Sequence, residues 1–195
     1  MIPRFSLCVY CGSRPGADPR FAEVAAEVGR WIGAHGGQLV YGGGNNGLMG
    51  VLATAALEAG ARVVGVIPHS MVEREWAKRD CTELHVVDNM HQRKSMMAER
   101  ADAFLALPGG IGTFEELFEV WSWRMLDFHR KPVGLLDHGG YYQALLRFLR
   151  DSVGHGFMNE AQMELLTVGS EPGPLLRELV QAAGIDPRPV DVSQI

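Results

Sequence analysis

The sequence predicts an α/β protein with a doubly wound, mainly parallel β-sheet and helices on both faces of that sheet. Two observations predict this fold. Short apolar runs typical of buried strands alternate with longer segments of helical periodicity along most of the chain. Two glycine-rich loops each join such an apolar run to a helix. This order implies right-handed crossovers between parallel strands, so ligands are expected at the carboxyl ends of the strands.

The elements follow one another without a repeat or a linker. The first strand is predicted over 5–10, and Asp18 can cap a first helix that ends at about His35, before Gly36 and Gly37. The further strands are predicted at 38–41, 62–67, 84–87, 103–107, 132–136 and 164–168. The further helices are predicted at 46–59, 90–100, 113–126, 140–151 and 173–183. We therefore expect a single Rossmann-like domain over 1–186 and a C-terminal tail over 187–195.

Composition and charge exclude several classes of protein. The 195 residues are 47% hydrophobic and 21% charged, as in a globular protein with one substantial core. No apolar run approaches the roughly 20 residues of a membrane-spanning helix, and the first residues lack the pattern of a signal peptide. We therefore expect a cytoplasmic protein that does not bind membranes. A formal net charge of -5 argues against nucleic-acid binding, which depends on clustered Lys and Arg.

Cys8 and Cys11 have the spacing of a redox or metal motif. They lie along the first predicted strand, where positions three apart point to opposite faces, whereas a redox pair normally opens a helix. None of the seven histidines falls in a two-ligand metal spacing. We therefore interpret both cysteines as structural and expect no metal site.

The first glycine-rich loop follows the strand at 38–41, and its Gly42, Gly44 and Gly47 satisfy the pattern G-x-G-x-x-G. A dinucleotide site is disfavoured, because the next strand ends in Pro68 and His69 and offers no acid for a ribose diol. Two interpretations remain open at even odds: the glycines permit a tight turn, or the loop contacts a ligand. Under the second interpretation, Gly43 and Gly44 are candidate contacts.

The second glycine-rich loop and the helix after it carry a sharper signal. Consecutive backbone N–H donors, a hydroxyl and the helix dipole together form a cradle for an anion. The loop lacks the lysine of a Walker motif, so a monophosphate suits it better than a triphosphate. Its candidate residues are Gly109, Gly110, Ile111, Gly112, Thr113, Phe114, Glu115 and Glu116.

The two glutamates of this helix are first-turn acids that favour the helix dipole, or they act on a ligand. Adjacent helical residues point about 100° apart, so only one of Glu115 and Glu116 can share the neighbours of the loop. An acid beside a bound anion is costly unless it contacts a cationic, hydroxylic or water group. We therefore favour a functional role for one of them.

Further candidates lie at the same edge of the predicted sheet. Arg93 and Lys94 stand in the first turn of a helix, where positive charge opposes the dipole, so an anion or acid nearby is expected. Glu75 could hold sugar hydroxyls or pair with Arg74 or Arg93, although a solvated loop acid is the simpler interpretation from the sequence. Ser13 could bind substrate as readily as cap its own loop.

Residues 108–116 match the pattern P-G-G-x-G-T-x-x-E, and together with 90–94 and the loop at 41–44 they make the chain resemble the Lonely Guy family. The resemblance extends from about 6 to 149 and includes 131–136 and 140–142. It implies a phosphoribohydrolase that cleaves the N-glycosidic bond of adenosine 5′-monophosphates, including N6-modified ones. The products are the free base, a cytokinin when N6 is modified, and ribose 5-phosphate. The resemblance also implies a homodimer without a metal or redox cofactor.

By position in these motifs, the resemblance makes Arg93 and Glu116 the catalytic pair. It makes Glu75 a substrate-binding acid, and Lys94 and the residues from Gly109 to Glu115 substrate contacts. A carboxylate suits this reaction because glycosidic cleavage builds positive charge on the ribose ring. Bulky Trp121 and Trp123 depart from the usual residues after the motif helix, which puts the substrate choice in doubt rather than the reaction.

Three other functions compete with the phosphoribohydrolase. A non-catalytic carrier or sensor of a nucleotide or cofactor is the main alternative, and the presence of both Arg93 and Glu116 favours the enzyme. A pyridoxal-dependent decarboxylase needs a lysine for its Schiff base, and of the three lysines only Lys94 falls among the motifs, where it already has a role. A dehydrogenase is disfavoured because the sequence lacks the acid that would bind the ribose diol of a dinucleotide.

Overall fold

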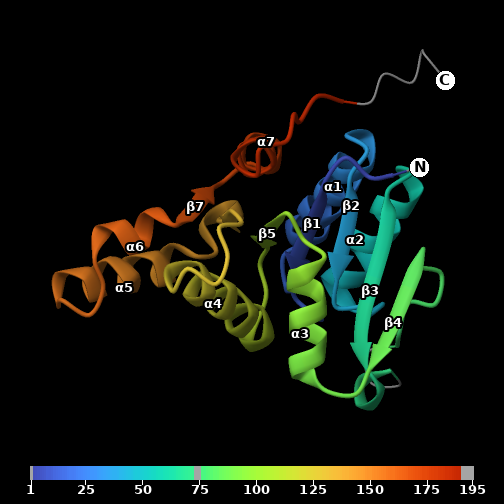
Figure 1. The fold of residues 1–195 in the computed structure, drawn as a ribbon, viewed down its shortest axis with the longest axis horizontal. Coiled ribbons are helices and arrows are strands. Elements are labelled where there is room, and N and C mark those ends of the chain that lie inside the picture. The colour runs from blue at the N-terminus through green and yellow to red at the C-terminus, as the bar shows by residue number, and fades with distance from the viewer. Residues whose placement is uncertain (1, 73–75, 190–195) are drawn as a thin grey trace.

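A computed structural model of the chain describes residues 2–72 and 76–189. Its described residues form a seven-stranded sheet in the order β4-β3-β2-β1-β5-β6-β7, and every pair of neighbouring strands is parallel. Figure 1 shows the sheet running from β4 at one edge to β7 at the other. The strands are β1 Ser6–Tyr10, β2 Gln38–Tyr41, β3 Arg62–Pro68, β4 Glu83–Val87, β5 Ala103–Ala106, β6 Val133–Leu136 and β7 Leu166–Gly169. The predicted fold class is confirmed.

Helices cover both faces of this sheet. One core contains buried side chains of α1, α2 and α7 together with one side of the strands, and the other contains those of α3, α4 and α5. Figure 1 shows α5 and α6 beyond the β7 side of the molecule, far from β4. The helices are α1 Arg20–Ala34, α2 Gly47–Glu58, α3 Met90–Glu99, α4 Ile111–Met125, α5 Gln143–Gly154, α6 Glu160–Glu164 and α7 Pro172–Ala182, with short 3-10 helices at His69–Met71 and His138–Gly140.

The alternation of side chains along β1 divides the two cores. Leu7 and Val9 lie in the first core, whereas Cys8 and Tyr10 lie in the second. Cys11 returns to the first core, so it and Cys8 are separated by the sheet, and both are free thiols. Burial raises the pKa of both thiols well above the ordinary value. The prediction that the two side chains point to opposite faces of the sheet is confirmed.

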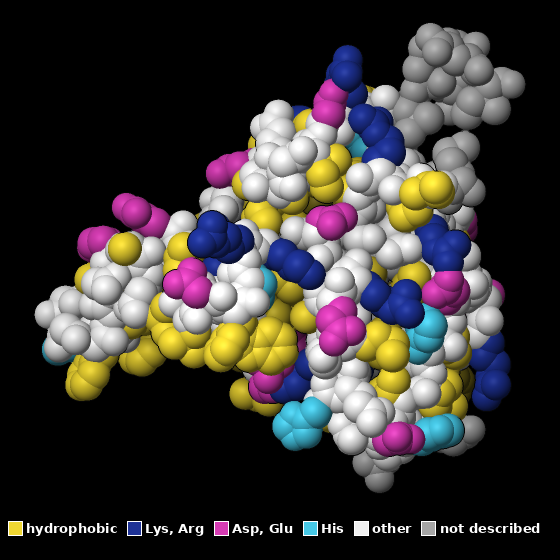
Figure 2. Space-filling view, in the orientation of Figure 1, with side chains coloured by type: hydrophobic (Ala, Val, Ile, Leu, Met, Phe, Trp, Pro, Cys, Tyr) yellow, Lys and Arg dark blue, Asp and Glu magenta, His cyan; other side chains and the backbone are white. Residues whose placement is uncertain are grey.

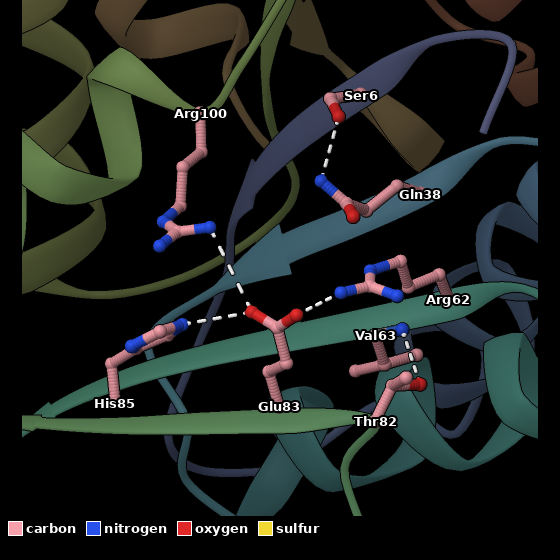
Figure 3. A network of polar contacts seen from close by, with 8 residues as sticks. All are labelled: Ser6, Gln38, Arg62, Val63, Thr82, Glu83, His85 and Arg100. Carbon is pink, nitrogen blue, oxygen red and sulfur yellow. Dashed lines mark hydrogen bonds and ion pairs between the residues drawn. The ribbon is translucent and has the colours of Figure 1, made fainter. Parts of the chain in front are cut away.

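The edge strand β4 is held to the sheet by side chains as well as by its ladder. Glu83 is paired with Arg62 of β3, with His85 at 2.9 Å and with Arg100 at 3.7 Å. Figure 3 shows the three basic groups converging on this one carboxylate. Because an edge strand lacks a second neighbour, these contacts add to its attachment, and the charged side chains discourage pairing with another chain.

The predicted elements differ from the observed ones mainly at their ends. The helix predicted at 113–126 begins earlier, at Ile111, so the description of Glu115 and Glu116 as first-turn acids was wrong. The one predicted at 140–151 begins later, because a 3-10 turn with Gly139 at φ 62° precedes it. Helix α6 was not predicted, although Asn159 and Gln162 form a capping box at its start.

Two expectations concern the ends of elements and of the chain. Asp18 does not occupy the N-cap position of α1, which is Pro19, but its carboxylate accepts a hydrogen bond from the N–H of Arg20 at 2.9 Å. The start of the C-terminal tail is tied to the N-terminal segment, because the Arg4 guanidinium donates to the carbonyls of Asp186 and Arg188. Over the described ranges, no helix is long and apolar enough to cross a membrane.

Candidate active site

A cavity of about 730 Å³ opens at the carboxyl ends of the central strands. It lies between the loops that follow β1 and β5, which are neighbours at the point where the strand order reverses. Such a switch point is where open α/β sheets bind their ligands, so the cavity occupies the predicted edge of the sheet. Its polar and charged lining residues include Ser13, Arg14, Arg93, Thr113, Glu115, Glu116 and Tyr141.

The loop after β5 is fixed in place by hydrogen bonds to its carbonyl groups. The Tyr142 hydroxyl donates to Leu107 O at 2.7 Å and the Tyr141 hydroxyl to Gly109 O at 2.6 Å. The N–H of Gly12 donates to Pro108 O at 3.1 Å. These contacts fix one side of the loop, and its residues 108–113 line the cavity.

The first backbone amides of α4 are the candidate anion-binding part of the cavity. The opening N–H groups of a helix have no partner inside that helix. In the described part of the chain, Phe114 is the first residue of this loop whose N–H bonds back, to Gly110 O at 3.0 Å. The 15-residue helix therefore presents its positive end to the cavity.

The glycines of this loop are explained in two different ways. A Cβ on Gly109 would come closer than 3.0 Å to the Thr113 side chain, so local packing alone requires a glycine there. A Cβ on Gly110 or Gly112 would meet no atom within 4 Å, and neither glycine has a positive φ. Local packing therefore leaves these two positions unexplained, whereas the approach of a ligand to the backbone explains them.

Arg93 is a buried arginine in the wall of the cavity, with 4% of its surface exposed. Its Nε donates to Val66 O of β3 at 3.1 Å, and its Nη2 donates to Gly42 O after β2 at 2.8 Å. The sulfur atoms of Met71 and Met90 lie 3.5 and 3.7 Å from Nη1. A buried guanidinium is costly without such acceptors, and here they also fix its orientation.

The first glycine-rich loop serves mainly to support this wall. A Cβ on Gly42 would come closer than 3.0 Å to the Arg93 guanidinium, and one on Gly47 would do the same to the backbone of Ser13 and Arg14. Gly42 lines the cavity. Gly43 and Gly44 instead pair with the segment at 76–78, through the bond from Lys78 N to Gly43 O at 2.9 Å and an isolated bridge.

The two neighbouring glutamates have different surroundings. Glu115 is paired with Lys94, as is Glu119 at 2.9 Å. Glu116 lines the cavity near the end of β1, where burial raises the pKa of the Cys11 thiol and the Glu116 charge raises it further. Glu115 also borders the cavity, so both acids reach it while facing different neighbours.

Several predicted site residues lie elsewhere. Lys94 is outside the cavity lining, and Phe114 packs edge-on against Tyr142 with ring centroids 6.1 Å apart. Glu75 lies outside the described residues. Conversely, sequence reasoning assigned no site role to Arg14 or Tyr141. It also assigned none to Met90, which lines the cavity and is 38% exposed. None of these three stands in a glycine-rich loop, where the sequence signal for an anion was concentrated.

An all-parallel sheet with a cavity at its switch point and a helix N-terminus facing that cavity defines a Rossmann-like protein whose cavity suits an anionic ligand. Solved structures share the fold. The molybdenum cofactor carrier protein from Chlamydomonas reinhardtii aligns with a TM-score of 0.68 at 22% identity, covering 94% of this chain and 99% of that one. The molybdenum cofactor binding protein from Rippkaea orientalis aligns with a TM-score of 0.68 at 21% identity, covering 93% and 98%.

Sequence comparison identifies the family. The family model described as "Possible lysine decarboxylase" matches residues 49–179. A cytokinin riboside 5′-monophosphate phosphoribohydrolase from Rhodococcoides fascians is 49% identical over 157 residues, 80% of this chain and 79% of that protein. One from Arabidopsis thaliana is 44% identical over 173 residues, 89% of this chain and 80% of that protein. The chain belongs to this group, the Lonely Guy family, as its motifs predicted.

Proposed function

We propose that the protein is a phosphoribohydrolase that cleaves cytokinin riboside 5′-monophosphates into the free base and ribose 5-phosphate. One observation carries the proposal: a single cavity combines Arg93, Glu116 and the amide-bearing start of α4. The names of the relatives from Rhodococcoides fascians and Arabidopsis thaliana support the same reaction and substrate class.

Glu116 is proposed to stabilise the transition state. Breaking the N-glycosidic bond leaves positive charge on the ribose ring, and a carboxylate at that point lowers the energy of this charge. The same carboxylate can orient and deprotonate the water that attacks C1 of the ribose. The bond from C1 to the base nitrogen breaks, its electron pair leaves with the base, and the water oxygen becomes the new C1 hydroxyl.

Arg93 is proposed to bind the substrate and to supply a fixed positive charge in the cavity wall, not to donate a proton. Its guanidinium is fixed by the carbonyls of Val66 and Gly42, and a guanidinium in proteins does not lose its proton. The leaving base therefore takes its proton from water. The proposed role for Arg93 is to keep a positive charge at a constant position in the cavity wall.

The start of α4 is proposed to bind the 5′-phosphate. The amides of residues 110–113 and the helix dipole both favour an anion, and the open backbone at Gly110 and Gly112 lets a phosphate approach. Binding of this remote group would position the glycosidic bond that breaks. Gly43, Gly44, Ser13 and Glu75 stay predicted substrate contacts.

Chromatographic detection of the products tests the proposed function. Purified protein is incubated with N6-isopentenyladenosine 5′-monophosphate and, separately, with adenosine 5′-monophosphate. Equal amounts of free base and ribose 5-phosphate are expected from at least the N6-modified nucleotide. If the protein binds these nucleotides but cleaves neither of them, the carrier alternative replaces the enzyme. That alternative keeps its place because cofactor carriers share the fold.

The decarboxylase description of the family model does not fit the cavity. Lys78 pairs with Asp80 at 3.0 Å, Lys94 pairs with two glutamates, and the Lys131 ammonium donates to Ala98 O at 2.7 Å. These are the three lysines of the chain, and none of them lines the cavity. A Schiff base with pyridoxal phosphate there would have no lysine to form it.

We also propose a cytoplasmic homodimer that does not bind nucleic acid. The net charge of -5 supports the last point.

Apolar side chains are exposed on α4 and just after it, at Phe118, Met125, Leu126 and Phe128. Figure 2 shows hydrophobic side chains gathered over this part of the molecule. Such a patch favours self-association, and sedimentation velocity of wild type against Phe128→Ser tests it, since a dimer should shift toward monomer.

A further inference from the structure

The charges around the cavity do not match the roles that the family motifs suggest for them. Two cations line the cavity, Arg14 and Arg93. Arg93 is buried against carbonyl groups. Arg14 is exposed, and no ion pair or hydrogen bond engages its side chain within the described part of the chain. Lys94, which the motifs assign to the substrate, does not line the cavity.

The backbone of Arg14 lies between the two glycine-rich loops. Two residues earlier, Gly12 donates to Pro108 O at 3.1 Å and accepts from the N–H of Leu48 at 3.0 Å. A Cβ on Gly47 would come closer than 3.0 Å to the Arg14 backbone, so the segments around Gly47 and Arg14 are in close contact. The base of the Arg14 side chain is therefore fixed beside the loop that leads into α4, while its guanidinium is free to meet a ligand.

Lys94 is bound to α4 instead. Its side chain is 11% exposed, and its ammonium contacts Glu115 and, at 2.9 Å, Glu119. Burial of the ammonium lowers the pKa of Lys94, but the two carboxylates outweigh this effect and raise it overall. Offering this charge to a phosphate would require breaking both ion pairs, whereas keeping them links α3, which carries Arg93, to α4, which carries Glu116.

We propose that Arg14 is the side chain that recognises the 5′-phosphate, and that Lys94 is a positioning residue that holds α4 against α3 through Glu115 and Glu119. The inference rests on the proposed function. A phosphate at the start of α4 would then be bound by amides on one side and by a guanidinium on the other, in the geometry that Arg provides for two phosphate oxygens.

The Arg14 role predicts a change in binding that depends on the phosphate. In Arg14→Gln, the KM for N6-isopentenyladenosine 5′-monophosphate should rise about 10- to 100-fold with little change in kcat. The affinity for the same riboside without its phosphate, measured by calorimetric titration, should be unaffected. Arg30→Gln, an exposed arginine of α1 outside the cavity lining, is the matched control. An unchanged KM in Arg14→Gln overturns this role.

The Lys94 role predicts a change in kcat that is shared with Glu119. Lys94→Met should lower kcat about tenfold with a smaller change in KM, because the reacting groups are misplaced. Glu119→Gln should lower kcat in the same direction, and adding it to Lys94→Met should cause no further loss. Lys94→Arg, which can still bridge two carboxylates, should restore most of kcat. A urea titration of each variant separates this effect from unfolding.

The opposite pattern would overturn the assignment. If Lys94→Met raises KM for the monophosphate alone while Glu119→Gln behaves as wild type, Lys94 contacts the phosphate. Calorimetric titration with adenosine 5′-monophosphate and with adenosine separates this failure from failure of the proposed function. Suppose that the wild type binds the nucleotide without cleaving it and that Arg14→Gln binds it about 10- to 100-fold more weakly. This result would reject the hydrolase and keep the phosphate role of Arg14.

Discussion

Replacing Gly42 with alanine should disable the active site without touching a group that reacts. Gly42 follows β2, and its carbonyl accepts from Arg93 Nη2 at 2.8 Å. A Cβ at this position would come closer than 3.0 Å to the guanidinium. Because Arg93 is 4% exposed and also bonded to Val66 O at 3.1 Å, the guanidinium cannot move away without losing a hydrogen bond.

The size of the effect follows from these contacts. A hydrogen bond from a charged group contributes about 1.5 to 3 kcal/mol, so the free energy of unfolding of Gly42→Ala should fall by about that amount. A displacement of Arg93 by about 1 Å should lower kcat about 100-fold. The KM should change less, because the proposed phosphate site lies on a different loop, at 109–113.

Steady-state release of the free base and urea denaturation together measure both effects. Gly154→Ala is the matched control, since a Cβ there meets no atom within 4 Å and the residue has no positive φ. This control should match wild type in kcat and should unfold at the same or a slightly higher urea concentration, because Ala is favoured over Gly in a helix. A Gly42→Ala variant whose kcat stays within about twofold of wild type would refute the reasoning that the fixed guanidinium matters.

Three further predictions concern stability. Tyr142→Phe removes the hydroxyl that donates to Leu107 O inside the protein, and should lower the unfolding free energy in urea by about 1 to 3 kcal/mol, with a higher KM; an unchanged KM would argue that this bond does not shape the loop. Leu105→Ala empties a fully buried position of β5 and should cost about 2 to 5 kcal/mol in the same assay, whereas a cost below about 1 kcal/mol would contradict the packed core. His129 is neutral in the fold, because burial lowers its pKa below 6.5 and Nδ1 accepts the N–H of Lys131 at 3.1 Å. The unfolded chain therefore binds more protons, so the contribution of His129 is present above about pH 6.5 and lost as the pH falls below it. Urea midpoints at pH 7.5 and 5.5 should drop less in His129→Gln than in wild type, and equal drops would exclude this residue as the cause.

Most of the fold could be predicted from the sequence because buried parallel strands leave a local pattern. The run at 38–41 is wholly apolar apart from Gln38, and the structure places a strand at the same residues. The helix ends were harder to predict. Gly140, expected to begin a helix, instead ends a short 3-10 turn, and the regular helix starts at Gln143. A turn of this kind depends on backbone contacts that periodicity does not record.

The candidate site was predictable only where a motif is contiguous. The glycine loop at 109–113 could be assigned to an anion because its donors are neighbours in the chain. Arg93 was expected to lie near an anion or an acid. The acceptors that the structure shows include the carbonyls of Val66, in β3, and Gly42, just after β2, which are both far from Arg93 in the sequence. The pairing of Lys94 with Glu119 likewise joins two helices, so the sequence could not show that this charge is already engaged.

The central claim is that the Glu116 carboxylate, in the second turn of α4, drives cleavage of the glycosidic bond, and Glu116→Gln tests it most directly. This change keeps the shape of the side chain and removes its charge. Glu99→Gln on α3, an exposed glutamate bonded to Ser95, is the control. Wild type and control should release free base and ribose 5-phosphate at the same rate from N6-isopentenyladenosine 5′-monophosphate. Glu116→Gln should bind the nucleotide but react about 10²- to 10⁴-fold more slowly. A Glu116→Gln variant that retains the wild-type kcat would contradict the account.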